Sequence, residues 1–198
     1  MTTRHAPVLC DEVVALLAVG PGGHWIDGTF GGGGHAAAIL TASDPDGRLL
    51  GIDRDPTALA RAAAAFAPFG DRLTLAEGNI AELGAIAAAR RWPACRGILF
   101  DLGISSDQLD DPARGLSFQH DGPLDMRLGP DADATAADLG GDLDEAALAD
   151  LIWRFGEERA SRRIAQAIVA ARPLRSTLEL AAVVARVVRP ERGRRPIH

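Results

Sequence analysis

The stretch Asp27-Gly28-Thr29-Phe30-Gly31-Gly32-Gly33-Gly34-His35, here called the glycine loop, is the strongest indication of the fold of this chain. It follows a short apolar run at 24–26 that predicts a β-strand, and it leads into an alanine-rich segment at 36–40 that can open a helix. Glycines permit positive φ angles and let a ligand approach the backbone closely. A second apolar run, 48–53, ends on an acid that can accept hydrogen bonds from both hydroxyls of an adenosine ribose. The order strand, loop, helix, strand therefore predicts a nucleotide-cofactor site.

The charge at the end of the first strand favours one cofactor over another. Residues 31–36 match the GxGxxG/A pattern of dinucleotide sites, but that pattern is a weak indication in a chain with 22 glycines. A carboxylate at Asp27 would repel a pyrophosphate, whereas it would attract the sulfonium and ammonium groups of S-adenosylmethionine. We therefore expect S-adenosylmethionine rather than NAD, with Asp27 and Asp53 among its contacts. The alternative is that Asp27 only braces the loop by accepting hydrogen bonds from backbone N–H groups.

Strands and helices continue to alternate after the glycine loop. We expect a helix starting at Asp55-Pro56, a third strand over 73–76, a helix over 80–91 capped by Asn79, and a fourth strand over 97–100. Four such alternations predict an α/β fold with a parallel, doubly wound sheet. Ligands bind such sheets at the carboxyl ends of the strands, which is where Asp27, Asp53 and Asp101 fall.

Composition narrows the class of protein further. The chain has 198 residues, of which 47% are hydrophobic, enough for one domain or for one domain with an appendage. No run approaches the roughly 18 apolar residues of a membrane span, and residues 1–7 lack a signal-peptide core. We therefore expect a cytoplasmic protein without a membrane partner. Cys10 and Cys95 lie far apart with no metal-type cluster around them, so we expect reduced thiols and no metal.

Charge is distributed unevenly along the chain. Residues 1–150 hold 10 arginines and 23 acidic residues, a net charge of −13, whereas residues 151–198 hold 11 arginines and 4 acidic residues, a net charge of +7. Basic segments of this kind often bind nucleic acid, although a solvated helix face would have the same composition.

The second half of the chain loses the strand pattern. Residues 103–141 are polar and rich in Asp, Gly and Pro, which predicts a loop or hinge. Three helices are expected after it: one over 143–155 capped by Asp144, one over 157–171, and one opened by the capping box Ser176-Thr177-Leu178-Glu179. A helical unit therefore follows the fourth strand.

Several longer motifs occur in order along the whole chain. They are His5-Ala6-Pro7-Val8-Leu9-Cys10-Asp11-Glu12-Val13, the glycine loop, Gly51-Ile52-Asp53-Arg54-Asp55-Pro56, Phe100-Asp101-Leu102-Gly103-Ile104-Ser105-Ser106-Asp107-Gln108-Leu109-Asp110, Arg114-Gly115-Leu116-Ser117-Phe118, Asp121-Gly122-Pro123-Leu124-Asp125-Met126-Arg127 and Gly156-Glu157-Glu158-Arg159. In these motifs the chain resembles the bacterial ribosomal RNA small-subunit methyltransferase H family, which methylates N4 of a cytidine in 16S rRNA.

The resemblance implies a fold and a division into domains. It implies a Rossmann-like class I methyltransferase sheet with strand order 3-2-1-4 and an inserted helical domain that recognises RNA. The cofactor-binding domain would span 1–105, the hinge 106–141 and the helical insertion 142–198. The implied cofactor is S-adenosylmethionine, and the implied partner is 16S rRNA of the small ribosomal subunit rather than DNA.

The resemblance also implies individual cofactor contacts. They fall on Gly33, Gly34, His35, Asp53, Ile80, Asp101 and Gln108. Similar family members usually carry Phe at the position of Ile80, so aromatic stacking on adenine would become plain apolar contact here.

Relatives continue beyond Pro196-Ile197-His198, through the rest of the inserted domain and the remaining strands. We therefore interpret the chain as part of a longer product that retains the cofactor contacts, with the strand of Ile98, Leu99 and Phe100 as an uncovered apolar edge. Two alternatives stay open. One is an inactive fragment that binds cofactor or RNA without turnover, and the other is an NAD-dependent oxidoreductase.

Asp101 is the candidate catalytic residue. The exocyclic amine of cytosine is a poor nucleophile, so a group must orient it and accept a proton after transfer. Many amino-methyltransferases use a D/N-P-P-Y/F motif here, whereas this chain has Asp101-Leu102-Gly103-Ile104. Asp101 could therefore act on the amine or only bind cofactor. His35 is a weaker candidate base, and packing against the cofactor is the favoured role for it.

An RNA base must leave its stack to reach a methyl donor, so a stacking surface and a phosphate-binding face are expected. The candidates are Phe118, Trp153 and Phe155 together with Arg154, Arg159, Arg162 and Arg163. For Trp153 a place in the helical core is favoured over an RNA contact, because aromatic residues on capped helices mostly belong to the core.

Overall fold

The computed structural model describes residues 7–188, except for the side chains of Ser106 and Asp107. Contacts divide the chain into two compact units. The first runs to Ser106 and also contains Leu128–Asp131, while the second contains Asp107–Arg127 and the described residues from Ala132 onward. The division into domains at 105 and 141 stays a prediction.

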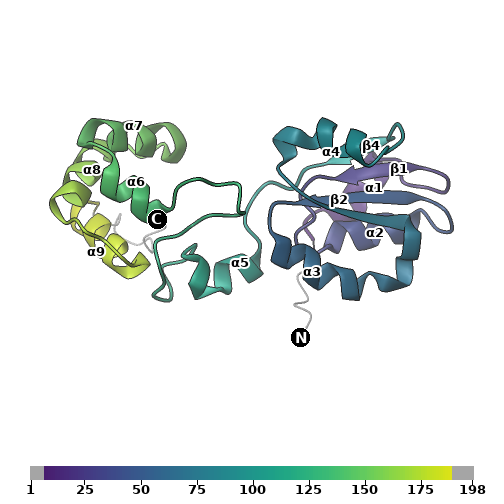
Figure 1. Ribbon diagram of the computed structural model, residues 1–198, viewed down its shortest axis with the longest axis horizontal. Helices are drawn as coiled ribbons and strands as arrows, with labels where there is room; N and C mark the ends of the chain where they lie inside the picture. Colours follow the sequence, from purple (N-terminus) through teal and green to yellow (C-terminus); the bar gives the residue numbers. More distant parts are fainter. Residues whose placement is uncertain (1–6, 189–198) are drawn as a thin grey trace. The chain divides into compact units, whose positions relative to one another are not determined.

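A four-stranded parallel sheet organises the first unit. Its strands are β1 (His24–Asp27), β2 (Arg48–Asp53), β3 (Leu73–Glu77) and β4 (Gly97–Leu99). Their order is β3-β2-β1-β4 and every pairing is parallel (Figure 1). The predicted parallel sheet and strand order are thus confirmed.

Helices cover both faces of this sheet. The helical elements of the unit are α1 (Cys10–Leu16), α2 (Gly34–Ala42), α3 (Pro56–Ala65), η1 (Ala67–Arg72), η2 (Ile80–Glu82) and α4 (Leu83–Ala89). Because successive residues of a strand point to opposite faces, Trp25 and Leu49 pack with α2 and α3, whereas Ile26 and Leu50 pack with α4. Figure 1 shows α4 on one side of the sheet and α2 and α3 on the other.

Local capping signals set two of the helix starts as predicted. The Asp55 carboxylate accepts a hydrogen bond from the Thr57 N–H at 2.9 Å, with Pro56 in the first helical turn. The Asn79 side chain accepts from the Ala81 N–H at 3.0 Å and caps the 3-10 helix η2, which α4 follows as far as Ala89 rather than the predicted residue 91. Asp53 is the last residue of β2, just before the Asp55 cap, and Ile80 begins η2 directly after the Asn79 cap, so both lie at the carboxyl ends of their strands.

Strand β4 forms one edge of the sheet, where among the described residues it pairs only with β1. Ile98 is 41% exposed and Phe100 is 47% exposed, so the expected apolar edge is present at these two residues. Leu99 differs, because it packs against the core shared with α2.

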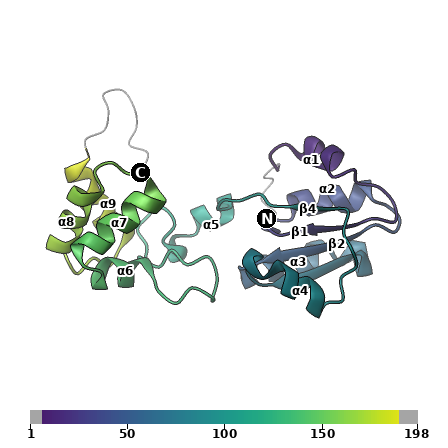
Figure 2. The ribbon, with the colours of Figure 1, turned by 90° about the horizontal axis from the view of Figure 1, so that it is seen from above.

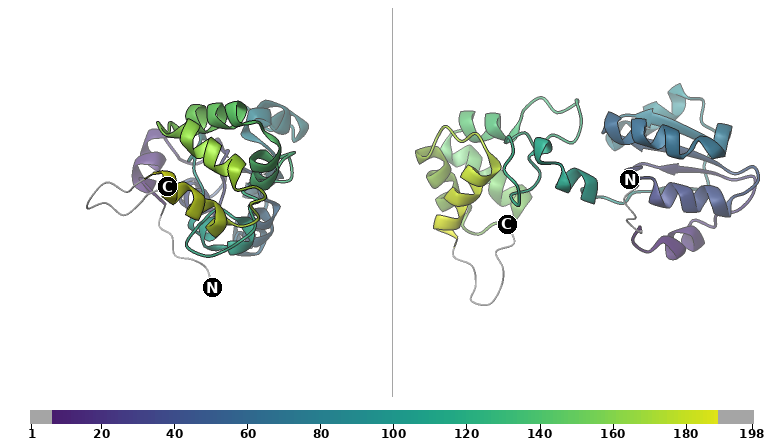
Figure 3. Two further views of the ribbon diagram at one scale, coloured as in Figure 1. Left: turned by 90° about the vertical axis from the view of Figure 1, so that its left-hand side faces the viewer. Right: turned by 90° about the horizontal axis from the view of Figure 1, so that it is seen from below.

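The second unit is helical. Its elements are α5 (Ser106–Asp110), η3 (Pro112–Arg114), α6 (Ala136–Asp142), α7 (Glu145–Gly156), α8 (Ser161–Ala170) and α9 (Thr177–Val187). Helices α7, α8 and α9 bury a common core that includes Leu148, Ile164 and Val183. The three helices pack together in Figure 2, and the same grouping is visible from two further sides in Figure 3.

The predicted caps at Asp144 and Ser176 are confirmed, but two expectations in this unit are wrong. Helix α8 begins at Ser161 rather than at 157, because Glu157 adopts φ 50° at the end of α7. The region expected as a loop contains α5 and α6, and α6 starts at a capping box between Thr135 and Asp138. None of the helices described here is long and apolar enough to cross a membrane.

Candidate active site

The glycine loop turns sharply between β1 and α2. Gly33 is the N-cap of α2 and has φ +77°, a conformation that residues with a Cβ rarely adopt. A Cβ at this position would lie 2.5 Å from Cζ of Phe66, so the space is closed as well. Gly34 and His35 then begin the helix. The loop backbone is therefore fixed by both conformation and packing at the carboxyl end of β1.

Asp53 ties the loop to the end of β2. Its Oδ2 accepts a hydrogen bond from the Gly31 N–H at 2.6 Å, and its Oδ1 accepts from the Asp55 N–H at 2.9 Å. A carboxylate has about four acceptor positions, so each oxygen retains capacity for one further donor. Asp53 can thus brace the loop and still accept from two ribose hydroxyls.

Asp27 lies beneath the loop and is only 1% exposed. Its Oδ1 accepts from the Thr29 N–H at 3.1 Å and from the Thr29 hydroxyl at 3.5 Å, so Asp27 does brace the loop. Its Oδ2 forms no hydrogen bond within the described part of the chain. Burial raises the pKa of Asp27 to about 6 against the opposing effects of the Thr29 hydrogen bond and of His35. The predicted contact of Asp27 with the cofactor stays a prediction.

Asp101 follows β4, and its side chain is 56% exposed. Its backbone N–H donates to the Thr29 hydroxyl at 2.7 Å, which links the end of β4 to the loop after β1. The carboxyl ends of the strands therefore bring together three acids, as the strand pattern predicted: Asp27, Asp53 and Asp101. Sequence reasoning missed Thr29, although a threonine two residues after an aspartate is a common turn signal.

His35 is 8% exposed and faces Asp101. Its Nε2 lies 2.9 Å from the Val8 carbonyl, which can only accept, so this nitrogen must carry the hydrogen. Nδ1 of the neutral ring is then an acceptor, and it lies 3.7 Å from Oδ2 of Asp101. With the ring neutral, two acceptors lie side by side and form a place for a group that donates hydrogen bonds, whereas a protonated ring would form an ion pair with Asp101.

Apolar side chains flank the loop at Gly28. A Cβ on Gly28 would lie 2.4 Å from Cε1 of Phe100 and 3.3 Å from Cγ2 of Ile80. Ile80 is a predicted contact residue, whereas Phe100 was expected only as part of a strand. Phe100 therefore adds an aromatic surface, 47% exposed, immediately before Asp101.

Asp131, far along the chain, links the loops after β2 and β3 through hydrogen bonds. Asp131 accepts hydrogen bonds from Nε and Nη2 of Arg54 at 3.1 and 3.0 Å, and from Nδ2 of Asn79 at 3.1 Å. Arg54 follows Asp53, and Asn79 precedes Ile80. No local pattern near residue 131 predicts this contact.

The remaining predicted residues lie in the helical unit. Gln108 belongs to α5, and its cofactor contact stays a prediction. The expectation that Trp153 belongs to the core is wrong, because Trp153 is 53% exposed. Leu148 and Ile152, four residues apart, take the core-facing positions of α7, so Trp153 falls on the outer side. Phe155 is 83% exposed and Phe118 is 42% exposed.

Comparison with known proteins places this site in a family context. A family model described as the MraW methylase family matches residues 2–198. The ribosomal RNA small subunit methyltransferase H of Acidiphilium cryptum is 53% identical over 192 residues, which cover 96% of this chain and 60% of that protein. Proteins of the same name from Syntrophobacter fumaroxidans and Thermomicrobium roseum are 49% and 48% identical, covering 98% of this chain and 62% and 60% of their own lengths. The chain thus spans about 60% of the length of these curated relatives.

Proposed function

The chain belongs to the MraW methylase family, and we propose that it binds S-adenosylmethionine and takes part in methylating N4 of a cytidine in 16S rRNA. The observation that carries this proposal is the row of acids at the carboxyl ends of the strands, beside a glycine loop in which Gly28 and Gly33 have no room for a Cβ. The names of the relatives support an rRNA substrate.

The residues present fit the charge of this cofactor. Asp53 has acceptor capacity for the ribose hydroxyls, and Ile80 offers an apolar surface near the loop. Asp27 is a buried acid with one oxygen that no described residue engages, so a cationic group nearby would stabilise its charged form. A pyrophosphate at the same place would meet that negative charge, which argues against an NAD-dependent oxidoreductase.

The acceptors at the end of β4 suit the chemistry of the amine. When bound, the cofactor supplies an electrophilic methyl group. Asp101 and Nδ1 of His35 would accept hydrogen bonds from the two N–H groups of the cytosine amine and orient its nitrogen. Transfer of that methyl group to the amine nitrogen would leave the nitrogen with a proton to lose, and the exposed Asp101 carboxylate would accept this proton.

Calorimetry on this chain tests the cofactor assignment. We expect S-adenosylhomocysteine to bind and NAD not to bind. Binding of NAD alone would overturn the proposal in favour of the oxidoreductase. Turnover is tested by methyl transfer to 16S rRNA in small ribosomal subunits with a protein of the relatives' full length. Cofactor binding without any transfer by that protein would support a binding-only function.

A further inference from the structure

A groove of about 900 Å³ runs between α7 and the start of α8 in the helical unit. We call it the α7–α8 groove. Its walls include Ala149, Asp150 and Trp153 from α7, and Arg159, Arg162 and Arg163 from the segment that opens α8. An exposed indole thus lies in the same groove as three guanidinium groups, which is the combination that single-stranded nucleic acid requires: a flat surface for a base and cations for phosphates.

The three groove arginines have no ion-pair partner within residues 7–188, in contrast to Arg114, Arg127 and Arg154 of the same unit. Arg154 pairs with Asp150 at 3.2 Å, and Arg172 donates to the Gly140 carbonyl at 2.6 Å. Those two arginines have structural roles that explain their positions. The groove arginines are exposed cations whose role the fold of the unit does not explain.

The positions of these cations oppose helix stability. Arg162 and Arg163 occupy the first turn of α8, which contains no acidic residue. The amino end of a helix carries partial positive charge, so acids stabilise it and cations destabilise it. Glu158 offsets part of this charge through a hydrogen bond to the Ala160 N–H at 2.6 Å. An anion bound in the groove would relieve the remaining repulsion.

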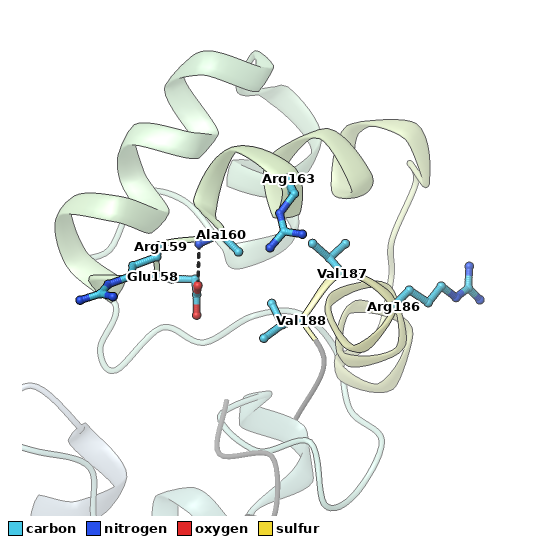
Figure 4. A pocket seen from close by; sticks show the side chains of 7 residues that line it. All are labelled: Glu158, Arg159, Ala160, Arg163, Arg186, Val187 and Val188. Carbon is cyan, nitrogen blue, oxygen red and sulfur yellow. Dashed lines mark hydrogen bonds between the residues drawn. The ribbon is translucent and has the colours of Figure 1, made fainter. Parts of the chain in front are cut away.

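A second pocket, of about 670 Å³, adjoins the first and shares Arg159 and Arg163 with it. Its far wall is formed by Arg186, Val187 and Val188 at the end of α9. In Figure 4, Arg163 lies beside Val187, while Arg159 and Arg186 extend outward on opposite sides. Arginines shared by two neighbouring pockets suit an extended polyanion better than a single small anion.

We propose that the α7–α8 groove binds single-stranded RNA, with one unpaired base stacked on Trp153 and neighbouring phosphates bound by Arg159, Arg162 and Arg163. This proposal deepens the proposed function and rests on it for the choice of RNA over an acidic protein segment. Phe155 is more exposed than Trp153 but is not part of the groove wall, so the proposal assigns it no role in stacking.

The phosphate contacts are tested on the full chain with a short, fluorescently labelled single-stranded oligoribonucleotide. Affinity should fall with the logarithm of salt concentration at a slope of about −0.7 per phosphate contacted. Replacing Arg159, Arg162 and Arg163 together with Gln should flatten that slope by about 2, as expected for three lost contacts. The matched control replaces Arg48, Arg61 and Arg90, three exposed arginines of the sheet unit, and should keep the parent slope. Equal slopes for the two triple variants would overturn the proposal.

The stacking contact is tested by single substitutions. Trp153→Ala should weaken RNA binding by about 5- to 150-fold with an unchanged salt slope, and Trp153→Phe should retain most of the affinity. Phe155→Ala should bind like the parent. Parent-like binding by Trp153→Ala would overturn the proposal. So would equal competition with the oligoribonucleotide by polyglutamate of the same charge, because the groove would then bind anions in general. S-adenosylhomocysteine binding, measured on the same samples, reports separately on the proposed function.

Discussion

Nδ1 of His35 lies 3.7 Å from Oδ2 of Asp101, and the other ring nitrogen of His35 is bound to the Val8 carbonyl. This bond holds the imidazole so that Nδ1, which is an acceptor in the neutral ring, faces the carboxylate. Because neither atom of the facing pair carries a hydrogen when the ring is neutral, the pair is arranged to receive a donor. A cytosine amine is such a donor, which makes Asp101 the residue whose substitution is most informative.

Substitution of Asp101 separates orientation from proton acceptance. In a protein of the relatives' full length, Asp101→Ala should lower methyl transfer by about 10²- to 10⁴-fold if the carboxylate accepts the proton. Asp101→Asn keeps a hydrogen-bond acceptor but is not a base, so it should be nearly as impaired. Near-normal turnover of Asp101→Asn would leave only an orienting role. A loss confined to cofactor affinity would identify Asp101 as a binding residue instead.

Substitution of Asp53 tests the ribose contact. Asp53→Ala should weaken S-adenosylhomocysteine binding by about 10- to 150-fold, corresponding to about 1.5 to 3 kcal/mol for two charge-assisted hydrogen bonds. Glu77→Ala is the matched control, because Glu77 is the exposed acid that pairs in register with Asp53 at the end of the neighbouring strand. Calorimetry that finds equal affinities for the two variants would remove Asp53 from the site.

Asp27 makes the stability of the protein depend on pH. Its pKa of about 6 exceeds the ordinary value of 3.8, so the folded state holds a proton that the unfolded state has released between about pH 4 and pH 6. Stability should therefore fall as pH rises through this window, by an amount on the order of 3 kcal/mol from Asp27 alone. Asp27→Asn keeps an oxygen that accepts from the Thr29 N–H without the charge. Urea denaturation should show this loss in the parent and not in the variant.

The same residue should make cofactor affinity depend on pH. The ammonium group of S-adenosylhomocysteine favours the charged carboxylate, so affinity should rise as pH increases through about 6. The charges of His35 and Asp53 also influence the pKa of Asp27. Comparing the parent with Asp27→Asn at each pH therefore isolates the contribution of Asp27 to the pH dependence of cofactor affinity. A pH profile identical in the two proteins would show that Asp27 only braces the loop.

Asp131 offers a test of how the loops around the site are held. The Arg54 guanidinium and the Asn79 amide hold the pKa of Asp131 below its usual value. Asp131→Ala should release both side chains and weaken S-adenosylhomocysteine binding by up to about fivefold, with a smaller difference at high salt. Asp133→Ala removes the same charge from an exposed position two residues further on and should bind like the parent. Equal weakening by both variants would indicate a general charge effect.

The sheet and the acids at its edge were predictable because their signals are local. Apolar runs of three to six residues, the caps at Asp55 and Asn79, and the glycines of the loop each specify their own segment. When four parallel strands alternate with helices, the carboxyl ends of all four strands must lie on the same side of the sheet. Asp27, Asp53 and Asp101 therefore meet whatever the details of packing.

The contacts between distant segments could not be predicted from the sequence and are known from the structure alone. Asp131 reaches Arg54 across 77 residues, and the Thr29 hydroxyl receives the backbone N–H of Asp101 across 72 residues. Such pairs depend on how the chain returns to the sheet, for which neighbouring residues carry no signal. The exposure of Trp153 also depends on tertiary packing. The sequence pattern of α7 predicts an apolar helix face, but the width of the face that becomes buried depends on how α8 and α9 pack against α7. Local sequence signals thus specify the sheet and the row of acids, whereas long-range packing selects the side chains that brace these acids and those that remain available for binding.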